Sequence, residues 1–254
     1  MRPICKVGGV EFEVARANRR FWDDDATRYH DAHPEYLSGF YWCPEMLSEA
    51  SAGLLGSVSG LRVLEIGCGS APCSSWLLRS SSPSLVVGFD ISMGMLSRSS
   101  GVPVVQADVQ ALPFADDSFD VTFSAFGGFA FVPSIPSVFA DVARVLTPGG
   151  RFVFSANHPM RWVFPDDPTS AGLTACIPYF ESSYSERDDD GNLTYAEYHR
   201  TFGEWVRALV SAGFVLDDVV EPEWPVGLDV TFGQWSPLRG SIFPGTAIFV
   251  AHLG

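Results

Sequence analysis

The chain has 254 residues, of which 46% are hydrophobic and 18% charged, and this is enough apolar material for one large folded domain. Its 30 acidic and 16 basic residues give a formal net charge of −14. Because an acidic surface repels phosphate groups, we expect neither a nucleic-acid partner nor binding to an anionic membrane.

Two further features of the sequence bear on its compartment. The sequence contains no run of about 18 apolar residues, so no membrane span is expected. Residues 1–6 lack the apolar run of a signal peptide, and the odd number of cysteines includes no C-x-x-C pair. Both observations favour a cytoplasmic protein with reduced thiols. The five thiols belong to Cys5, Cys43, Cys68, Cys73 and Cys176.

The N-terminal part of the chain is predicted to be helical. Apolar and aromatic positions recur at a spacing of three to four over residues 16–32, which indicates an amphipathic helix. His33 and Pro34 end it, because the residue before a proline avoids the helical conformation. A second helix is expected over residues 44–55, ending at Gly56.

The next segment has the pattern of a strand, a glycine turn, a helix and a second strand. Strands are predicted over residues 61–66 and 84–90, with a helix over residues 71–80 between them. Gly67 and Gly69 follow the first strand and allow the backbone to approach a ligand, because no Cβ atom intervenes. Such a unit is suited to holding a nucleoside.

Two acidic residues in this unit indicate which nucleoside it holds. Asp90 closes the second strand, where a carboxylate can accept hydrogen bonds from both ribose hydroxyls. Glu65 precedes the glycine turn, where it would repel a diphosphate but suits an ammonium or sulfonium group. Pro72 stands where a dinucleotide fingerprint would have its third glycine, and the turn has no P-loop lysine. These departures disfavour a dinucleotide or a nucleoside triphosphate.

Strands and helices continue to alternate along the chain, which predicts a parallel, doubly wound sheet with its ligand at the carboxyl ends of the strands. The alternation lapses after residue 158, where two polar and aromatic runs flank a turn at Asp190 and Gly191. The expected elements after the unit above are helix 92–99, strand 102–107, strand 120–125, helix 134–146, strand 151–156, the hairpin arms 179–187 and 193–200, helix 202–212, strand 214–220, loop 221–245 and strand 246–252.

Four segments in this order resemble motifs of one enzyme family. They are the Glu65–Gly69 turn, Asp90 to Ser92, Gln106 to Asp120, and Leu146 to Phe152. The sequence is similar to the class I S-adenosylmethionine (SAM)-dependent methyltransferases, and within them to the ubiquinone/menaquinone-biosynthesis-like (methyltransferase 11) branch.

The resemblance implies an α/β fold with a doubly wound, mostly parallel, seven-stranded Rossmann-like sheet whose last strand is antiparallel. It divides the chain into an N-terminal helical segment, residues 1–60, that covers the cofactor site, and a SAM-binding core, residues 61–254. The break in alternation at residues 158–200 is interpreted as an inserted cap.

The resemblance also implies residues that hold SAM. Carboxylates would serve the polar groups: Asp90 would bind the ribose and Asp108 the adenine amine. Glu65 would serve the methionine ammonium directly, through water or by fixing the turn. Backbone groups and apolar side chains would supply the remaining contacts. For the two aromatic residues upstream of the sheet, an ordinary place in the core is the alternative. The predicted cofactor-binding residues are Glu65, Gly67, Gly69, Asp90, Ile91, Met95, Asp108, Val109, Ser124, Ala125, Tyr29 and Trp42.

Methyl transfer needs alignment and desolvation more than acid–base catalysis, although a hydroxyl or carbon acid also has to lose a proton. The candidate general base is His158, directly after the fifth predicted strand. Its alternative is a structural histidine bonded to the backbone of a turn. His30, His33 and His199 are further histidines with weaker claims, and no metal site is expected.

The sequence thus predicts an enzyme that moves a methyl group to oxygen or carbon of a small molecule. Aromatic residues are dense after residue 158, which indicates an apolar or aromatic acceptor. Three alternatives stay open: a non-catalytic SAM-binding module, an NAD-dependent reductase and a protein methyltransferase. The expected partner is a small-molecule acceptor, and the protein is expected to be a monomer or a homodimer.

Overall fold

The computed structural model describes the backbone of residues 7–254 and the side chains of residues 13–254. The expectations that concern residues 1–6, including Cys5, lie outside these described residues. Within the described chain, Cys43, Cys68, Cys73 and Cys176 are free cysteines. No helix of this part is long and apolar enough to cross a membrane.

Seven of the described strands form one sheet with the order β3-β2-β1-β4-β5-β9-β8. Neighbours from β3 to β5 are parallel, whereas β9 is antiparallel to both β5 and β8. The predicted doubly wound sheet with an antiparallel last strand is therefore confirmed. The strands are β1 (Arg62–Ile66), β2 (Leu85–Asp90), β3 (Val104–Gln106), β4 (Phe119–Ser124), β5 (Leu146–Asn157), β8 (Phe214–Val220) and β9 (Thr246–Leu253).

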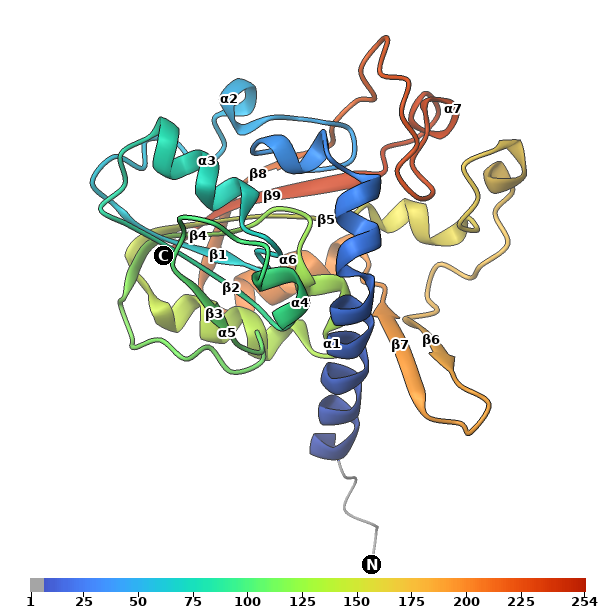
Figure 1. Ribbon diagram of the computed structural model, residues 1–254, viewed down its shortest axis with the longest axis horizontal. Coiled ribbons are helices and arrows are strands. Elements are labelled where there is room, and N and C mark those ends of the chain that lie inside the picture. The colour runs from blue at the N-terminus through green and yellow to red at the C-terminus, as the bar shows by residue number, and fades with distance from the viewer. Residues whose placement is uncertain (1–6) are drawn as a thin grey trace, which may run out of the picture.

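Helices cover both faces of the sheet, with α3 on one face and α5 and α6 on the other (Figure 1). The long helix α1 runs past the edge of the core and contacts α4 and the hairpin strand β7. The described α-helices are α1 (Val7–Ala32), α2 (Glu49–Ala52), α3 (Pro72–Ser80), α4 (Met93–Leu96), α5 (Ile135–Val145), α6 (Phe202–Ser211) and α7 (Pro237–Gly240).

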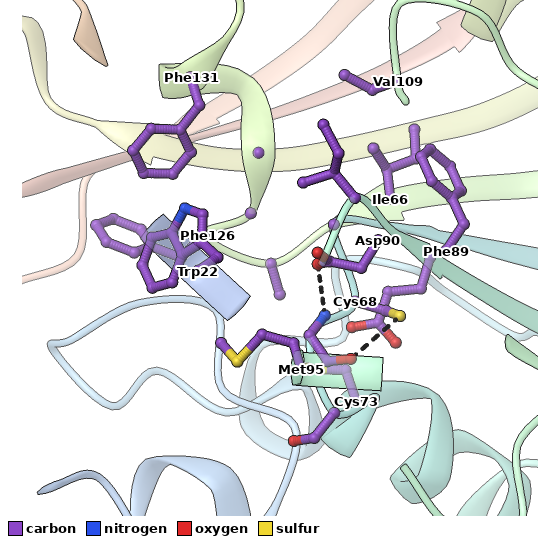
Figure 2. A pocket seen from close by; sticks show the side chains of 18 of the residues that line it. Trp22, Ile66, Cys68, Cys73, Phe89, Asp90, Met95, Val109, Phe126 and Phe131 are labelled. Atoms are coloured by element: carbon purple, nitrogen blue, oxygen red, sulfur yellow. Dashed lines mark hydrogen bonds between the residues drawn. The ribbon is translucent and has the colours of Figure 1, made fainter. Parts of the chain in front are cut away.

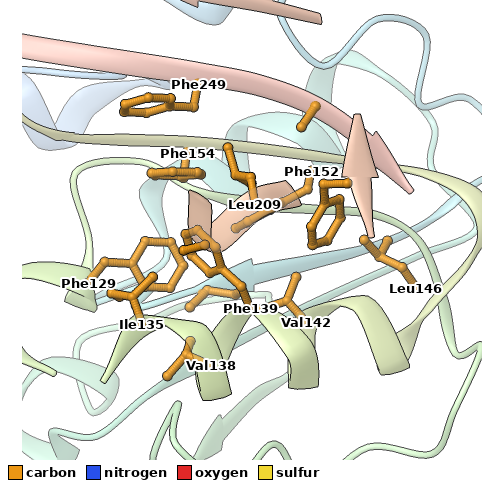
Figure 3. Packing of buried hydrophobic residues seen from close by; sticks show 14 of the residues in the cluster. Phe129, Ile135, Val138, Phe139, Val142, Leu146, Phe152, Phe154, Leu209 and Phe249 are labelled. Atoms are coloured by element: carbon orange, nitrogen blue, oxygen red, sulfur yellow. The ribbon is translucent and has the colours of Figure 1, made fainter. Parts of the chain in front are cut away.

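The larger core lies between the sheet and helices α5 and α6, and it is dominated by phenylalanine (Figure 3). Phe154 of β5 stacks on Phe249 of β9 with ring centroids 4.9 Å apart. Phe139 of α5 meets Phe152 edge to face at 5.2 Å. Each fully buried aromatic ring removes a large apolar area from water, so this layer holds the sheet rigid beneath the ligand-binding edge.

Residues 158–200 leave the alternating pattern, as the sequence predicts. They contain the 3₁₀ turns η3 (Pro159–Val163) and η4 (Ser170–Leu173) and the hairpin β6 (Ser183–Arg187) with β7 (Leu193–Tyr198). The two hairpin strands are antiparallel and form a separate two-stranded sheet beside α1 (Figure 1). The predicted hairpin around Asp190 and Gly191 is confirmed.

The expected second N-terminal helix, residues 44–55, is wrong, because only the single turn Glu49–Ala52 is helical. Met46 has a positive φ of 60°, which interrupts any helix through it. Ser48 then caps the short turn by accepting a hydrogen bond from its backbone, and Gly53 ends the turn in the left-handed conformation.

Three further predicted boundaries shift. The helix expected over residues 92–99 shortens to Met93–Leu96, because the hydroxyls of Ser97 and Ser99 bond back to carbonyl groups of the same turn. The strand expected over residues 102–107 shortens to β3, and the strand expected over residues 151–156 lengthens to β5. The carboxyl ends of these two strands differ from the predicted ends by one residue each.

Candidate functional site

A cavity of about 1140 Å³, counted with the part open to solvent, lies at the carboxyl ends of β1, β2 and β4. Ligand sites of open α/β sheets lie at this edge. Helix α1, the glycine turn after β1 and the turn η2 (Gly128–Phe131) after β4 supply walls of the cavity. The same edge therefore gathers residues that are more than a hundred positions apart.

The glycine turn after β1 brings backbone close to backbone. Gly67 has a φ of +65°, and a Cβ atom there would lie 2.7 Å from the backbone nitrogen of Gly128. Gly69 also has a positive φ, of +54°, and its N–H points toward the end of β2. Both glycines line the cavity, as the sequence predicts, and Gly67 has no room for a side chain.

Asp90 lies at the end of β2, in the middle of the cavity wall (Figure 2). One carboxylate oxygen accepts a hydrogen bond from the Gly69 N–H at 2.9 Å, and the other accepts from the Ser92 N–H at 2.8 Å. Burial raises the pKa of the Asp90 carboxyl, and these backbone donors oppose the rise. Because a carboxylate oxygen has more than one lone pair, both oxygens can still accept from a ligand.

Glu65 is buried beneath the glycine turn, at the N-terminus of α3. Its Oε2 accepts hydrogen bonds from the backbone N–H of Ser74 at 2.9 Å and from the Ser74 hydroxyl at 2.5 Å. Burial raises the pKa of Glu65 to about 7, against the effect of these two donors, and the nearby Asp90 carboxylate adds to the rise. Glu65 thus neutralises the positive end of α3 and fixes the turn.

A further group of predicted residues lines the side of the cavity below β2 and β3. Ile91 is part of this lining. Val109 and Met95 of α4 also line the cavity (Figure 2). The carboxylate of Asp108 accepts from the backbone N–H of Gln110 at 2.9 Å, which orients it beside the cavity. The arrangement offers apolar faces for a flat ring with a hydrogen-bond acceptor at its edge.

Aromatic side chains line the opposite side of the cavity, and most of them were missed by the sequence analysis. Trp22 of α1 and Phe131 of η2 meet edge to face with ring centroids 5.5 Å apart (Figure 2). Trp22 and the predicted Tyr29 are also in contact, 5.8 Å apart. Asn18, Trp22 and Tyr29 are spaced four and seven along α1, so helical periodicity could have placed them on one face. Phe126 and the tyrosines Tyr36 and Tyr41 complete this side.

Two predicted residues lie outside the lining of this cavity. Trp42 is fully buried in the core, where its indole N–H donates to Glu49 at 2.9 Å, and this matches the alternative considered for it. The hydroxyl of Ser124 donates to the carbonyl of Ile66 at 2.8 Å, inside the sheet. Its neighbour Ala125 does line the cavity.

His158 also lies outside the cavity lining, at the end of β5. Its Nε2 bonds to a carboxylate oxygen of Glu221 at 2.7 Å, and its Nδ1 accepts from the Met160 N–H at 3.0 Å. The proton therefore lies on Nε2, and both ring nitrogens are engaged. Burial lowers the pKa of His158, while Glu221 opposes the change. These contacts match the structural alternative for His158, and its role as a base stays a prediction.

Asn18 fastens α1 over the cavity. Its Nδ2 donates to the carbonyls of Phe131 and Ala196, at 3.2 and 3.0 Å, and its Oδ1 accepts from the Ala196 N–H at 2.9 Å. The amide thus pairs with both backbone groups of Ala196 on β7, as a neighbouring strand would. A single buried side chain joins α1, η2 and the hairpin.

The residues present fit SAM. Gly67 packs directly against the backbone of Gly128, so the glycine turn after β1 lies against the start of η2 at the edge of the cavity. Carboxylates at the ends of β1 and β2 suit an ammonium and a ribose, and the apolar faces beside Asp108 suit a purine. No cluster of three or more metal-ligating side chains occurs among the described residues.

Comparisons with known proteins agree with this geometry. Residues 64–154 match the family model described as a methyltransferase domain. The chain has the fold of the class I SAM-dependent methyltransferases, and this segment is similar to their domain. A crystal structure of an S-adenosylmethionine-dependent methyltransferase from Mesorhizobium loti superimposes with a TM-score of 0.65, at 27% identity over 80% of this chain and 95% of that one.

Two curated relatives match part of this chain. A fatty-acid O-methyltransferase of Mycolicibacterium smegmatis is 34% identical over 115 residues, or 43% of this chain and 41% of the relative. A phthiotriol/phenolphthiotriol dimycocerosates methyltransferase of Mycobacterium leprae is 31% identical over 109 residues, or 41% and 40%. The matched segments thus span about two fifths of these relatives' length.

Proposed function

We propose that this chain is an enzyme that transfers the methyl group of SAM to oxygen or carbon of a small, apolar or aromatic molecule. The observation that carries the proposal is the placement of Asp90. Its carboxylate is held by two backbone donors at the end of β2, beside the glycine turn and facing the cavity. This placement suits the two hydroxyls of a ribose.

The remaining polar groups are proposed to hold the other parts of SAM. Glu65 would attract the methionine ammonium through the turn, and the Ala125 carbonyl would accept from it. Ile91, Met95 and Val109 would pack on adenine, whose amine would donate to Asp108. Tyr29 of α1 would cover the methionine end of SAM. The N-terminal segment that contains Tyr29 would cover the cofactor site.

The chemistry requires mainly orientation and exclusion of water. When bound, SAM supplies a sulfonium whose carbon–sulfur bond breaks with its electron pair left on sulfur, as the acceptor atom bonds to the methyl carbon and releases its proton to solvent. The walls from α1 and η2 enclose the reacting groups, and alignment of this kind contributes up to about 7–11 kcal/mol. His158, the predicted base, lies outside the cavity lining with both ring nitrogens engaged, so this proposal assigns it no step of the reaction.

An NAD-dependent reductase is a weaker candidate on physical grounds. A dinucleotide places its pyrophosphate at the N-terminus of the helix after the glycine turn. In this chain the Glu65 carboxylate already accepts from Ser74 at that helix end. A diphosphate there would face a buried acid.

A non-catalytic SAM-binding module and a protein methyltransferase are also disfavoured. The aromatic residues opposite Asp90 and Asp108 leave room for a second molecule beside SAM, which a protein that binds SAM alone would not need. A cavity covered by α1 suits a small molecule better than a protein segment. We further propose a cytoplasmic monomer or homodimer without a nucleic-acid partner, in keeping with its net charge of −14.

The test is calorimetric titration of the wild-type chain and of Asp90→Ala with S-adenosylhomocysteine (SAH), with Asp229→Ala as a matched control on an exposed loop. The proposal expects micromolar binding that Asp90→Ala weakens at least tenfold and that Asp229→Ala leaves unchanged. Wild-type protein that is folded but binds neither SAM nor SAH would overturn the assignment.

A further inference from the structure

The charge of the cavity carries a conclusion about the acceptor. Three carboxyl groups line the cavity, those of Glu65, Asp90 and Asp108. Among the described residues of its lining, none is lysine or arginine. The one histidine of the described lining, His30, donates from Nδ1 to the Ala26 carbonyl at 2.6 Å, and its Nε2 has no hydrogen-bond partner among the described residues.

The nearby buried arginines are already committed elsewhere. Arg200 bonds to the carbonyls of Phe129, Val132 and Tyr198 behind η2. Arg161 is paired with carboxylates outside the cavity, Asp166 at 2.7 Å and Glu197 at 3.5 Å. Neither of them lines the cavity, so a carboxylate placed there would meet no lysine or arginine among the described residues of the lining.

The side of the cavity lined by aromatic residues of α1, residues 36–41 and η2 is called the acceptor side below. It offers neutral hydrogen-bonding groups and aromatic rings instead of cations. Tyr29, Tyr36 and Tyr41 line it, and burial raises the pKa of both Tyr29 and Tyr36 far above the ordinary tyrosine value. These hydroxyls therefore stay protonated. The rings of Trp22 and Phe131 present π faces, which attract cations and uncharged planar molecules and repel anions.

We propose that the methyl acceptor of this site is an uncharged apolar or aromatic molecule that offers a hydroxyl group, and that free carboxylic acids are poor acceptors. This inference rests on the proposed function and limits the methyl acceptor to uncharged molecules. SAM brings an ammonium beside its own carboxylate, so the cofactor does not meet the same penalty. A carboxylic acceptor brings no such counter-charge.

The inference separates this chain from one of its relatives. The fatty-acid O-methyltransferase acts on a carboxylic acid by name, but the shared segment is 115 residues, 43% of this chain. Helix α1 and residues 36–41, which form much of the acceptor side, lie outside the residues 64–154 that match the methyltransferase family model. The two proteins can therefore differ in the residues around the methyl acceptor while their SAM-binding segments are similar.

The test compares matched acceptors that differ in charge: 2-naphthol against 2-naphthoate, and 1-dodecanol against dodecanoate. Transfer of a labelled methyl group from SAM is measured at pH 7.5, together with calorimetric binding of each compound to SAH-loaded protein. We expect at least one neutral member to bind and to be methylated with kcat/KM at least tenfold above its carboxylate partner. Equal or preferred use of the carboxylates, or binding of neither neutral compound, overturns the inference.

A charge-adding variant makes the test specific. Leu37 lines the acceptor side, so Leu37→Lys should supply the missing cation and strengthen carboxylate binding about tenfold, whereas Leu37→Met should not. Carboxylate binding that is unaffected by the lysine in folded, SAH-binding protein contradicts the electrostatic argument. SAH titration of the same samples separates the two proposals, because failure of SAH binding rejects the methyltransferase function itself.

Discussion

The contact that fastens α1 to the cap is open to a quantitative test through Asn18→Ala. Asn18 is 2% exposed and satisfies three buried backbone groups: the N–H and carbonyl of Ala196 and the carbonyl of Phe131. The substitution leaves all three without their partner. It also removes a side chain that fits between α1 and β7.

The magnitude follows from the cost of unsatisfied groups. A buried donor or acceptor left unpaired costs about 1–3 kcal/mol, and carbonyls with a second lone pair lie at the lower end. Partial rehydration of the gap reduces the sum, so we expect the free energy of unfolding to fall by about 2–4 kcal/mol. Because Trp22 and Phe131 lose their shared anchor, binding of SAH should weaken severalfold as well.

The assay is equilibrium unfolding in urea followed by tryptophan fluorescence and circular dichroism. Arg19→Ala, an exposed change on the same helix, is the control and should alter the free energy of unfolding by less than about 0.5 kcal/mol. If Asn18→Ala matches this control, then Asn18 is not what joins α1 to the hairpin, and the argument from its three bonds is refuted.

Two further predictions concern the glycine turn. Because burial raises the pKa of Glu65 to about 7 and a bound ammonium favours the ionised form, SAH affinity should rise about tenfold from pH 6 to pH 8. By the same shift, the contribution of Glu65 to stability is largest at low pH and is lost as the pH rises from 4.5 to about 7. Glu65→Gln should flatten the affinity profile, and a profile equally steep in this variant would assign the proton to another group. Gly67→Ala places a Cβ atom 2.7 Å from backbone at a φ of +65°, so it should lower the free energy of unfolding by more than about 2 kcal/mol and impair SAH binding. Gly149→Ala, with a φ of +75° and open space around it, should cost only about 1 kcal/mol and leave binding intact, and equal losses in both variants would contradict the steric argument.

The sequence predicts which residues meet at the carboxyl ends of the strands, because local patterns determine their positions. Gly67, Gly69 and Asp90 lie at strand ends, and parallel strands bring their carboxyl ends to one edge whatever the loops do. The strands and the hairpin follow from alternation and from turn residues in the same way. Such features depend on neighbours in the sequence rather than on distant contacts.

The acceptor side could not be predicted in the same way, because it depends on how α1 docks. Trp22 and Phe131 are 109 positions apart, and the bonds of Asn18 that bring them together have no local sequence signal. Trp42 has the same composition-based claim as Trp22, yet it is buried by the core instead. The helix expected over residues 44–55 failed for a local reason, since the Ser48 cap and the positive φ at Met46 overrode helical propensity.

The most direct test of the central claim is calorimetric titration with SAH of the wild-type chain beside Asp90→Ala. The account predicts one site per chain with micromolar affinity, lost by at least tenfold in the variant while its unfolding transition stays that of a folded protein. Unchanged binding in Asp90→Ala would contradict the placement of the ribose at the end of β2. Absence of binding by folded wild-type protein would contradict the methyltransferase function itself.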